Sequence, residues 1–207
     1  MAQSSFPFEN VDVSETDFGK WASNFQDYGV RGVPGDTNLQ VTGDNSGMQV
    51  RVAAGEAFVR GHYYVNSAQA TVTLDTANAS SPRIDAIVLE LDLSANSVLL
   101  KAVQGTAAGS PTAPTLTQTT TGVYQLLLAY VSVAAAATSI VAGNVTDLRT
   151  FMGQRVGIWT TATRPANPTA KATIGFNTTL GYHEYWTGSA WSSLAPDTTS
   201  PFMLMGA

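Results

Sequence analysis

The chain has 207 residues and no cysteine, only 12% of its residues are charged, and its formal net charge is −5. The absence of cysteine excludes disulfide bridges, thiolate nucleophiles and cysteine-ligated metal centres. Lysine and arginine are few and scattered singly, which excludes a basic surface for a nucleic-acid backbone, so we expect no nucleic-acid partner.

The low charge also bears on association. Ordinary soluble domains carry about 25% charged residues, so a monomer of this composition would expose much uncharged surface. An oligomer, or a place in a larger assembly, covers such surface. We therefore expect the chain to associate with copies of itself.

The N-terminal region predicts a short amphipathic helix. Ser14 is an N-cap candidate, and Glu15 and Asp17 place negative charge in the first turn. Apolar residues follow at the i, i+3, i+4 and i+7 spacing of one helix face, namely Phe18, Trp21, Ala22 and Phe25. We expect the helix to end near residues 28–29.

Two segments bear on export and membranes. Residues 1–9 contain neither a basic segment nor a long apolar run, so they predict no secretory signal and a protein made and kept in a cytoplasm. Residues 122–143 are uncharged and close to the roughly 20 residues that span a bilayer. Polar residues interrupt this run, and its first half is typical of a buried strand. We therefore expect a strand there and no membrane insertion.

From residue 32 onward, turn clusters separate short segments that alternate apolar and polar residues. Strands are expected at residues 48–52, 57–60, 62–65, 70–74, 84–93, 97–105 and 123–133. A strand about every ten residues is typical of a β-sandwich or barrel. The sequence therefore predicts an all-β fold: a β-sandwich or barrel-like domain, a short N-terminal helix and a small C-terminal three-stranded unit.

Two local expectations follow for the larger domain. The segments at 84–93 and 97–105 predict a long antiparallel hairpin with Glu90 and Asp92 on its solvent face. Residues 106–121, rich in alanine, threonine, glycine and proline, predict an extended loop that wraps the surface.

We place the domain boundaries by these changes in pattern. Residues 1–31 are expected to be a docking segment with the helix, 32–153 the β-sandwich or barrel domain, and 154–207 a small C-terminal β-hairpin unit and tail. Some 40 residues in three strands bury little apolar area, so this unit is expected to need a partner surface or its own symmetry mates.

The chain contains no motif that predicts catalysis. His62 and His183 each lack a second histidine at metal-ligand spacing. The carboxylates that could form a glycosidase pair have simpler explanations as helix-start and strand-surface residues. Nucleophile elbows, phosphate-binding loops and calcium loops are absent from the sequence. We expect no enzymatic activity, no metal and no cofactor.

Pairs of opposite charge at strand ends are expected to be architectural. Arg83 with Asp85, and Asp147 with Arg149, could form ion pairs that pin a loop to a strand.

The aromatic residues of the C-terminal unit have the most functional potential. They are Trp159, Tyr182, Tyr185, Trp186 and Trp191. Sugars stack on flat aromatic faces, and protein interfaces favour tryptophan and tyrosine, so this set predicts glycan or partner binding. Most of these rings also suit the hydrophobic core of so small a unit.

An ordered set of motifs covers roughly residues 35–150. It comprises Pro82-Arg83-Ile84-Asp85, a hairpin, Gln104-Gly105-Thr106, the proline-rich stretch 111–118, Tyr124-Gln125-Leu126-Leu127-Leu128-Ala129 and Thr146-Asp147-Leu148-Arg149. In this order the set resembles a module of tailed-bacteriophage baseplate and minor tail proteins. Residues 164–169 (RPANPT) and 185–191 (YWTGSAW) resemble a second phage-tail pattern, which often links or tips tail fibres.

The resemblance implies an all-β virion tail component, commonly a homotrimer or part of a ring, that holds other tail proteins or contacts the host surface. We expect an adaptor or fibre base of the tail tip or baseplate, docked through Phe18, Trp21 and Phe25, with the C-terminal unit projecting outward. The alternative is a receptor-binding module for host cell-wall glycan, and a glycan-cleaving tail enzyme is a third reading. The resemblance departs from long tail fibres in one respect, because the sequence shows neither collagen-like repeats nor a large C-terminal head domain, so a dedicated host-binding head is not expected.

Overall fold

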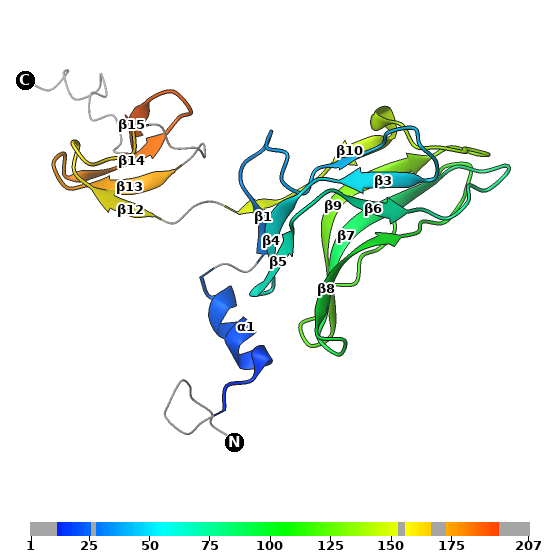
Figure 1. Cartoon of the computed structure of the whole chain (residues 1–207), viewed down its shortest axis with the longest axis horizontal. Coiled ribbons are helices and arrows are strands. Elements are labelled where there is room, and N and C mark those ends of the chain that lie inside the picture. The colour runs from blue at the N-terminus through cyan, green and yellow to red at the C-terminus, as the bar shows by residue number, and fades with distance from the viewer. Residues whose placement is uncertain (1–11, 26–27, 153–155, 167–172, 195–207) are drawn as a thin grey trace, which may run out of the picture. The chain divides into compact units, whose positions relative to one another are not determined.

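The computed structural model describes residues 12–25, 28–152, 156–166 and 173–194. The chain divides into two compact units, Met1–Met152 and Gly153–Ala207, and each is described by itself. Both consist of strands, and the described residues contain one α-helix, α1 (Glu15–Ser23) (Figure 1). The predicted all-β fold is therefore confirmed.

Three sheets build the first unit. The first has the order β11-β1-β4-β5, with β11 at Phe151–Met152, β1 at Tyr28–Arg31, β4 at Gly55–Val59 and β5 at His62–Asn66. The second has the order β2-β3-β6, with β2 at Val41–Thr42, β3 at Gln49–Val52 and β6 at Ala70–Thr73. The third has the order β10-β9-β7-β8, with β10 at Val145–Asp147, β9 at Val123–Val133, β7 at Arg83–Asp92 and β8 at Ser97–Val103. A short 3₁₀ helix, η1 (Ala142–Asn144), precedes β10.

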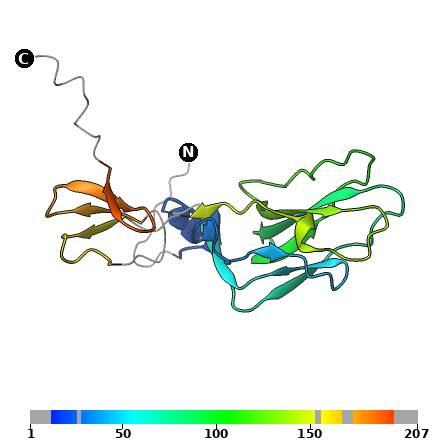
Figure 2. The same cartoon turned by 90° about the horizontal axis from the view of Figure 1, so that it is seen from above.

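One apolar core joins the three sheets. Successive strand residues point to opposite faces, so each alternating strand turns its apolar set inward. Each sheet contributes fully buried side chains, including Val30 and Val59 from the first, Val50 and Val52 from the second, and Ile87, Leu89 and Leu128 from the third. Figure 2 shows the strands of this unit from above.

The face of β7 that was expected to meet solvent is buried. Ala86 and Val88 are fully buried and Glu90 is 9% exposed. The proline-rich loop covers this region: Thr117 donates its backbone N–H to the side chain of Gln125, which lies opposite Glu90 on β9. The expectation of a solvent face was wrong because the alternation of apolar and polar residues in β7 does not reveal a loop packed on the polar side.

Residues 122–143 contain β9, in agreement with the expected strand. Among the described residues, no helix is both long and apolar enough to cross a membrane.

The second unit is a single sheet with the order β12-β13-β14-β15. Its strands are β12 (Gly157–Trp159), β13 (Ile174–Asn177), β14 (Tyr182–Trp186) and β15 (Trp191–Ser193). The last three are the expected strands, which the structure pairs as an antiparallel meander, and β12 adds a fourth strand, parallel to β13. Parallel strands are joined by a long connection and not by a tight turn, so no turn motif in the sequence predicts the pairing of β12 with β13.

Candidate functional site

Helix α1 begins as its sequence predicts. Ser14 is the N-cap: its hydroxyl accepts the backbone N–H of Asp17 at 3.1 Å and donates to the Asp17 carboxylate at 2.7 Å. Glu15 and Asp17 lie in the first turn, where the helix dipole favours negative charge. The helix ends at Ser23, earlier than expected, and the next described strand, Tyr28–Arg31, is β1, which pairs with β4 and β11. The stretch at 28–31 is therefore part of the first sheet.

Two glycines bring α1 against the turn between β4 and β5. A Cβ atom on Gly19 would lie 2.7 Å from Cε1 of His62, and one on Gly61 would overlap the carbonyl oxygen of Gly19. Gly61 also has a φ of +78°, which suits glycine in this tight turn. Thr16, Lys20 and Ser23 line the same side of the helix, together with Gly19. The helix thus packs on the domain through small and polar residues.

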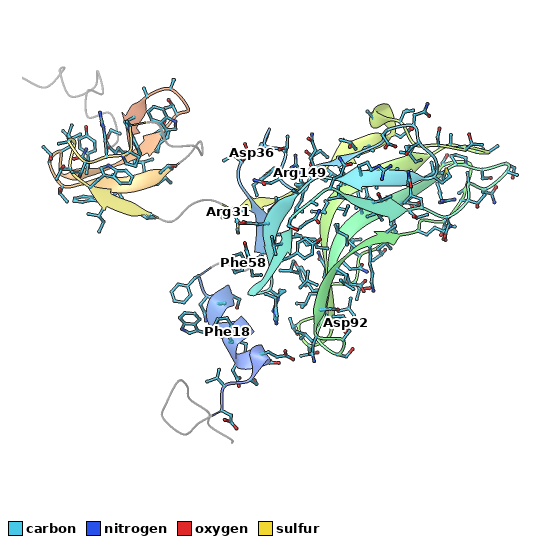
Figure 3. All side chains as sticks on the ribbon, viewed as in Figure 1. Phe18, Arg31, Asp36, Phe58, Asp92 and Arg149 are labelled. Carbon is cyan, nitrogen blue, oxygen red and sulfur yellow. The ribbon has the colours of Figure 1, made fainter. Side chains whose placement is uncertain are left out.

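The opposite side of α1 carries Phe18 and Trp21, and Phe25 follows two residues after the helix ends; these three rings form an aromatic surface. Their exposed fractions are 58%, 49% and 73%. The ring centroids of Phe18 and Trp21 are 5.7 Å apart and those of Trp21 and Phe25 are 5.0 Å apart, so the three rings form one continuous patch. Figure 3 labels Phe18 on this helix. The sequence predicted this cluster, and the structure places all three rings together and in solvent.

This orientation is the reverse of an ordinary surface helix. Such a helix buries its apolar stripe and exposes its polar side. Here the apolar stripe is exposed, although the aromatic rings would gain free energy from burial, about 25 cal/mol for each Å² of apolar surface. An exposed aromatic patch of this kind is typical of a protein-interaction surface.

The C-terminal aromatic set divides between the two faces of its sheet. Trp159, Tyr182, Trp186 and Trp191 share one face by strand register, and Tyr185 lies on the other. Trp191 packs edge-on against Trp159, with ring centroids 4.9 Å apart, and tilted against Trp186 at 5.6 Å. Trp186 is only 8% exposed. The three tryptophans therefore form the packed interior of the unit, which leaves Trp186 little surface on which a sugar could stack.

A buried glutamate holds this tryptophan cluster together. Glu184 is 2% exposed. Its Oε1 accepts hydrogen bonds from Trp159 Nε1 at 2.7 Å and from Asn177 Nδ2 at 2.9 Å. Its Oε2 lies 3.0 Å from the Arg164 guanidinium. Burial raises the pKa of Glu184, but these partners outweigh it and hold the pKa below its ordinary value.

The same contacts explain the second sequence pattern. Arg164 pairs with Glu184, and the carbonyl of Pro165 accepts the Nε1–H of Trp191 at 3.1 Å. These two contacts hold Arg164 and Pro165, the start of the RPANPT segment, against β14 and β15, which carry the ends of the YWTGSAW segment. Residues 167–169 of the first motif lie outside the described residues. Glu184 and Arg164 could not be recognised as partners from the sequence, because a charge pair between a loop and a strand leaves no fixed spacing.

Motif residues of the first unit also have structural contacts. Arg83 forms a fully buried pair with Asp85 at 2.9 Å and donates to the carbonyls of Asp75 and Thr76, while Asp85 accepts the N–H of Gly105. These contacts confirm the expected pinning of a loop to a strand.

Arg149 forms the second expected pair. It bonds to Asp147 at 2.6 Å and donates to the carbonyl of Asn38, and its guanidinium lies over the ring of Phe151. The hydrogen bond from Arg149 lowers the pKa of Asp147 below its ordinary value. The motif thus fastens the end of the domain to its first loop.

The carboxylates Glu90 and Asp92 make hydrogen bonds that hold the fold. Glu90 bonds to Lys101 at 2.5 Å and accepts from Gln125 at 2.7 Å. Burial raises its pKa, but these two partners bring it below the ordinary value. Asp92 accepts the backbone N–H groups of Ser94 and Ala95 and so closes the β7–β8 turn.

The histidines have separate surroundings. His62 lies beneath α1, with Nδ1 3.0 Å from the carbonyl oxygen of Arg60, and His183 is exposed with its ring against Phe176. In the described part of the chain, no three side chains of histidine, aspartate or glutamate gather into a potential metal site. The aromatic surface of α1 is therefore the feature with the clearest functional potential. A scan of the sequence against protein-family models gives no match, and neither does a search of curated proteins.

Proposed function

We propose that this chain is a structural component of a phage tail tip or baseplate, an adaptor that does no chemistry and docks to neighbouring tail proteins through α1. The observation that carries the proposal is the outward orientation of Phe18, Trp21 and Phe25. A helix fixed to its domain by glycines and presenting anchors at i, i+3 and i+7 suits a groove on another protein.

The ordered motifs that resemble baseplate and minor tail proteins supply the kind of assembly. The charged residues of these motifs hold loops against strands through two ion pairs, Arg83 with Asp85 and Arg149 with Asp147. That role supports a scaffold, because a module of this type has to hold its shape while other proteins attach to it. In this proposal the chain acts in the virion, after synthesis in the host cytoplasm.

The test is incorporation into tails. We expect the double variant Trp21→Ala, Phe25→Ala to be lost from purified tail particles, because aromatic anchors dominate interface energies and each typically contributes about 2 kcal/mol or more. The variant should keep its folding stability within about 0.5 kcal/mol, because both side chains are solvent-exposed. Incorporation is measured by quantitative immunoblotting of purified tails, and stability by denaturant unfolding.

Leu99→Ala is the matched control. Leu99 is 52% exposed on β8 and belongs to the same unit, so its truncation removes exposed apolar surface outside α1. Tails that contain the control but not the double variant support docking through the helix. Normal amounts of the double variant in tails would contradict it.

Glycan binding through the C-terminal aromatics is the competing function. Trp186→Ala would disturb the buried cluster as well as any sugar site, so Tyr185→Ala, on the opposite face, is the more informative variant. Loss of host-cell binding by folded Tyr185→Ala protein, with tail incorporation intact, would favour glycan recognition.

A further inference from the structure

A small cavity lies within the first unit, between α1 and the strands and loops that α1 packs against. Its volume is about 60 Å³, which is room for a few water molecules or for one anion of the size of phosphate or acetate. Four segments line it: α1, the β4–β5 turn with the start of β5, the end of β7 with the residue after it, and the segment 119–122 before β9. The helix and the body of the domain therefore face a common space.

Three basic side chains line this cavity. Lys20 comes from α1, Arg60 lies in the β4–β5 turn, and His62 is the first residue of β5. No aspartate or glutamate in the described part of the chain is among the residues that line it. The whole chain has 15 acidic residues against 10 lysines and arginines, so this concentration of basic groups runs against its composition. A concave site lined by one sign of charge attracts ions of the opposite sign, which are anions here.

Contacts within the first unit hold the two basic residues of the β4–β5 hairpin in place. The guanidinium carbon of Arg60 lies 5.5 Å from the ring centroid of Tyr124. Nδ1 of His62 lies 3.0 Å from the carbonyl oxygen of Arg60, and because a carbonyl only accepts, Nδ1 carries a proton. Nε2 is then the ring nitrogen that remains for a ligand. It lies beside α1, since a Cβ atom on Gly19 would be 3.3 Å from it.

Lys20 adds a basic group from the helix side. Its side chain is 71% exposed, and its Nζ lies 4.0 Å from Oδ1 of Asp17, at the outer limit of an ion pair. The other carboxylate oxygen of Asp17 accepts the hydroxyl of Ser14 at 2.7 Å. An exposed pair at this distance neutralises Lys20 only weakly, and an ammonium group has three protons to donate. Lys20 is therefore able to bind an anion in the cavity.

We propose that this cavity binds a small oxyanion, a phosphate or a carboxylate, between Lys20 on one side and Arg60 and His62 on the other. The oxygen atoms of such a group accept several charge-assisted hydrogen bonds at once, and these are the strong ones. Leu91 and Leu93 also line the cavity, which suits a short apolar stem beside the charged group. A bound anion joins α1 to the body of the domain.

This inference does not rest on the docking role of α1, because binding is measured on the purified full-length chain alone. Inorganic phosphate and acetate are the two probes, and each is titrated at an ionic strength held constant with chloride, which separates a specific site from general screening. We expect saturable shifts of the amide NMR signals of α1 and residues 60–62, and slower amide hydrogen exchange in α1 when the site is filled. The probe that binds more tightly distinguishes a phosphate ligand from a carboxylate ligand.

Lys20→Gln and His62→Gln each remove one basic group and keep a polar side chain. We expect each to weaken binding about tenfold, because one hydrogen bond to the charged ligand is lost. Arg31→Gln is the matched control, since Arg31 is a basic residue of the same unit that pairs with Glu56 and does not line the cavity. This control should bind the probes as the wild type does, and circular dichroism should show that all three variants are folded.

The double variant Trp21→Ala, Phe25→Ala should also bind the probes as the wild type does, which separates this cavity from the docking surface. Three results would overturn the proposal: a wild-type chain that binds neither phosphate nor acetate saturably, binding that both cavity variants leave unchanged, or an equal loss of binding in Arg31→Gln.

Discussion

Glu184 connects three parts of the second unit, since it bonds to a tryptophan, an asparagine and an arginine that come from different segments. Replacing Glu184 with alanine would leave Trp159 Nε1 and the Arg164 guanidinium without their acceptor. We expect the unit to lose about 2 kcal/mol of unfolding free energy, less than for a fully buried pair because the Arg164 side chain is 31% exposed. Denaturant unfolding followed by tryptophan fluorescence measures this loss.

The control for that substitution is Glu56→Ala, which removes a surface ion pair with Arg31 in the first unit. Exposed pairs contribute about 0–1 kcal/mol, so this variant should change little. Equal effects of the two substitutions would contradict the central structural role of Glu184.

The same residue predicts a pH dependence. The pKa of Glu184 is lower in the folded chain than its ordinary value of 4.5, so its contribution to stability is fully present above that value and is lost as the pH falls through the folded pKa. We expect the second unit to lose stability as the pH falls below about 4.5. Glu184→Gln, which does not titrate, should be less stable at pH 7 and show a smaller decrease in stability on acidification, measured by tryptophan fluorescence. An unchanged pH dependence in this variant would assign the effect to other groups.

At the residue scale, the sequence identifies residues with a structural role more readily than it identifies the partners of those residues. Arg83 with Asp85, and Asp147 with Arg149, were recognisable as pairs because each spans two positions. The partners of Glu184 come from residues 7 to 25 positions away, and no local pattern connects them. The tryptophans were identified correctly as a group, but the division of the aromatic set between two faces required the register of β14.

Helix α1 shows that the spacing of residues predicts an element and the members of its apolar face, but not by itself whether that face is buried or exposed. The i, i+3, i+7 spacing predicts which residues share a face, but an exposed and a buried face have the same spacing. Gly19 and Gly61 decide the orientation because only glycine permits so close an approach of helix and turn. Their role could not be inferred before the turn and the helix were seen together.

Gly61→Ala should detach the helix. The added Cβ would overlap the carbonyl oxygen of Gly19, and the left-handed φ of +78° adds a conformational cost of about 1 kcal/mol. We expect faster amide hydrogen exchange throughout α1 in this variant. Gly35→Ala is the control: its φ is +102°, but a Cβ added there would have no atom within 4 Å, so this variant should show only the conformational cost. Equal protection of α1 in the two variants would contradict packing through Gly61.

Strand pairing shows the same limit of local pattern. The expected strands between residues 48 and 133 are present, because their alternation and turns are local signals. The strands β1 and β11 were missed because both are short and they pair with each other in parallel across more than 100 residues of sequence; β1 also pairs antiparallel with β4. Such pairing depends on the whole domain and has no sequence period of its own.

At the scale of the whole molecule, exposed apolar side chains lie in both units among the described residues, for example Phe18 in the first and Ile158 in the second. The aromatic surface of α1 follows an acidic first turn, and the described residues on the outer face of the C-terminal sheet, the face that carries Tyr185, include no aspartate, glutamate, lysine or arginine. The composition predicts that part of the surface is covered, but it does not predict where that part lies.

The most direct test of the docking role is site-specific photo-crosslinking in assembled tail particles. A photoreactive side chain is placed at Trp21, with a second chain carrying it at Leu99 as the control, since both positions are about half exposed. Docking through α1 predicts a crosslink from position 21 to a different tail protein and none from position 99. Particles that contain the chain but give no crosslink from position 21, or equal crosslinks from both positions, would contradict it.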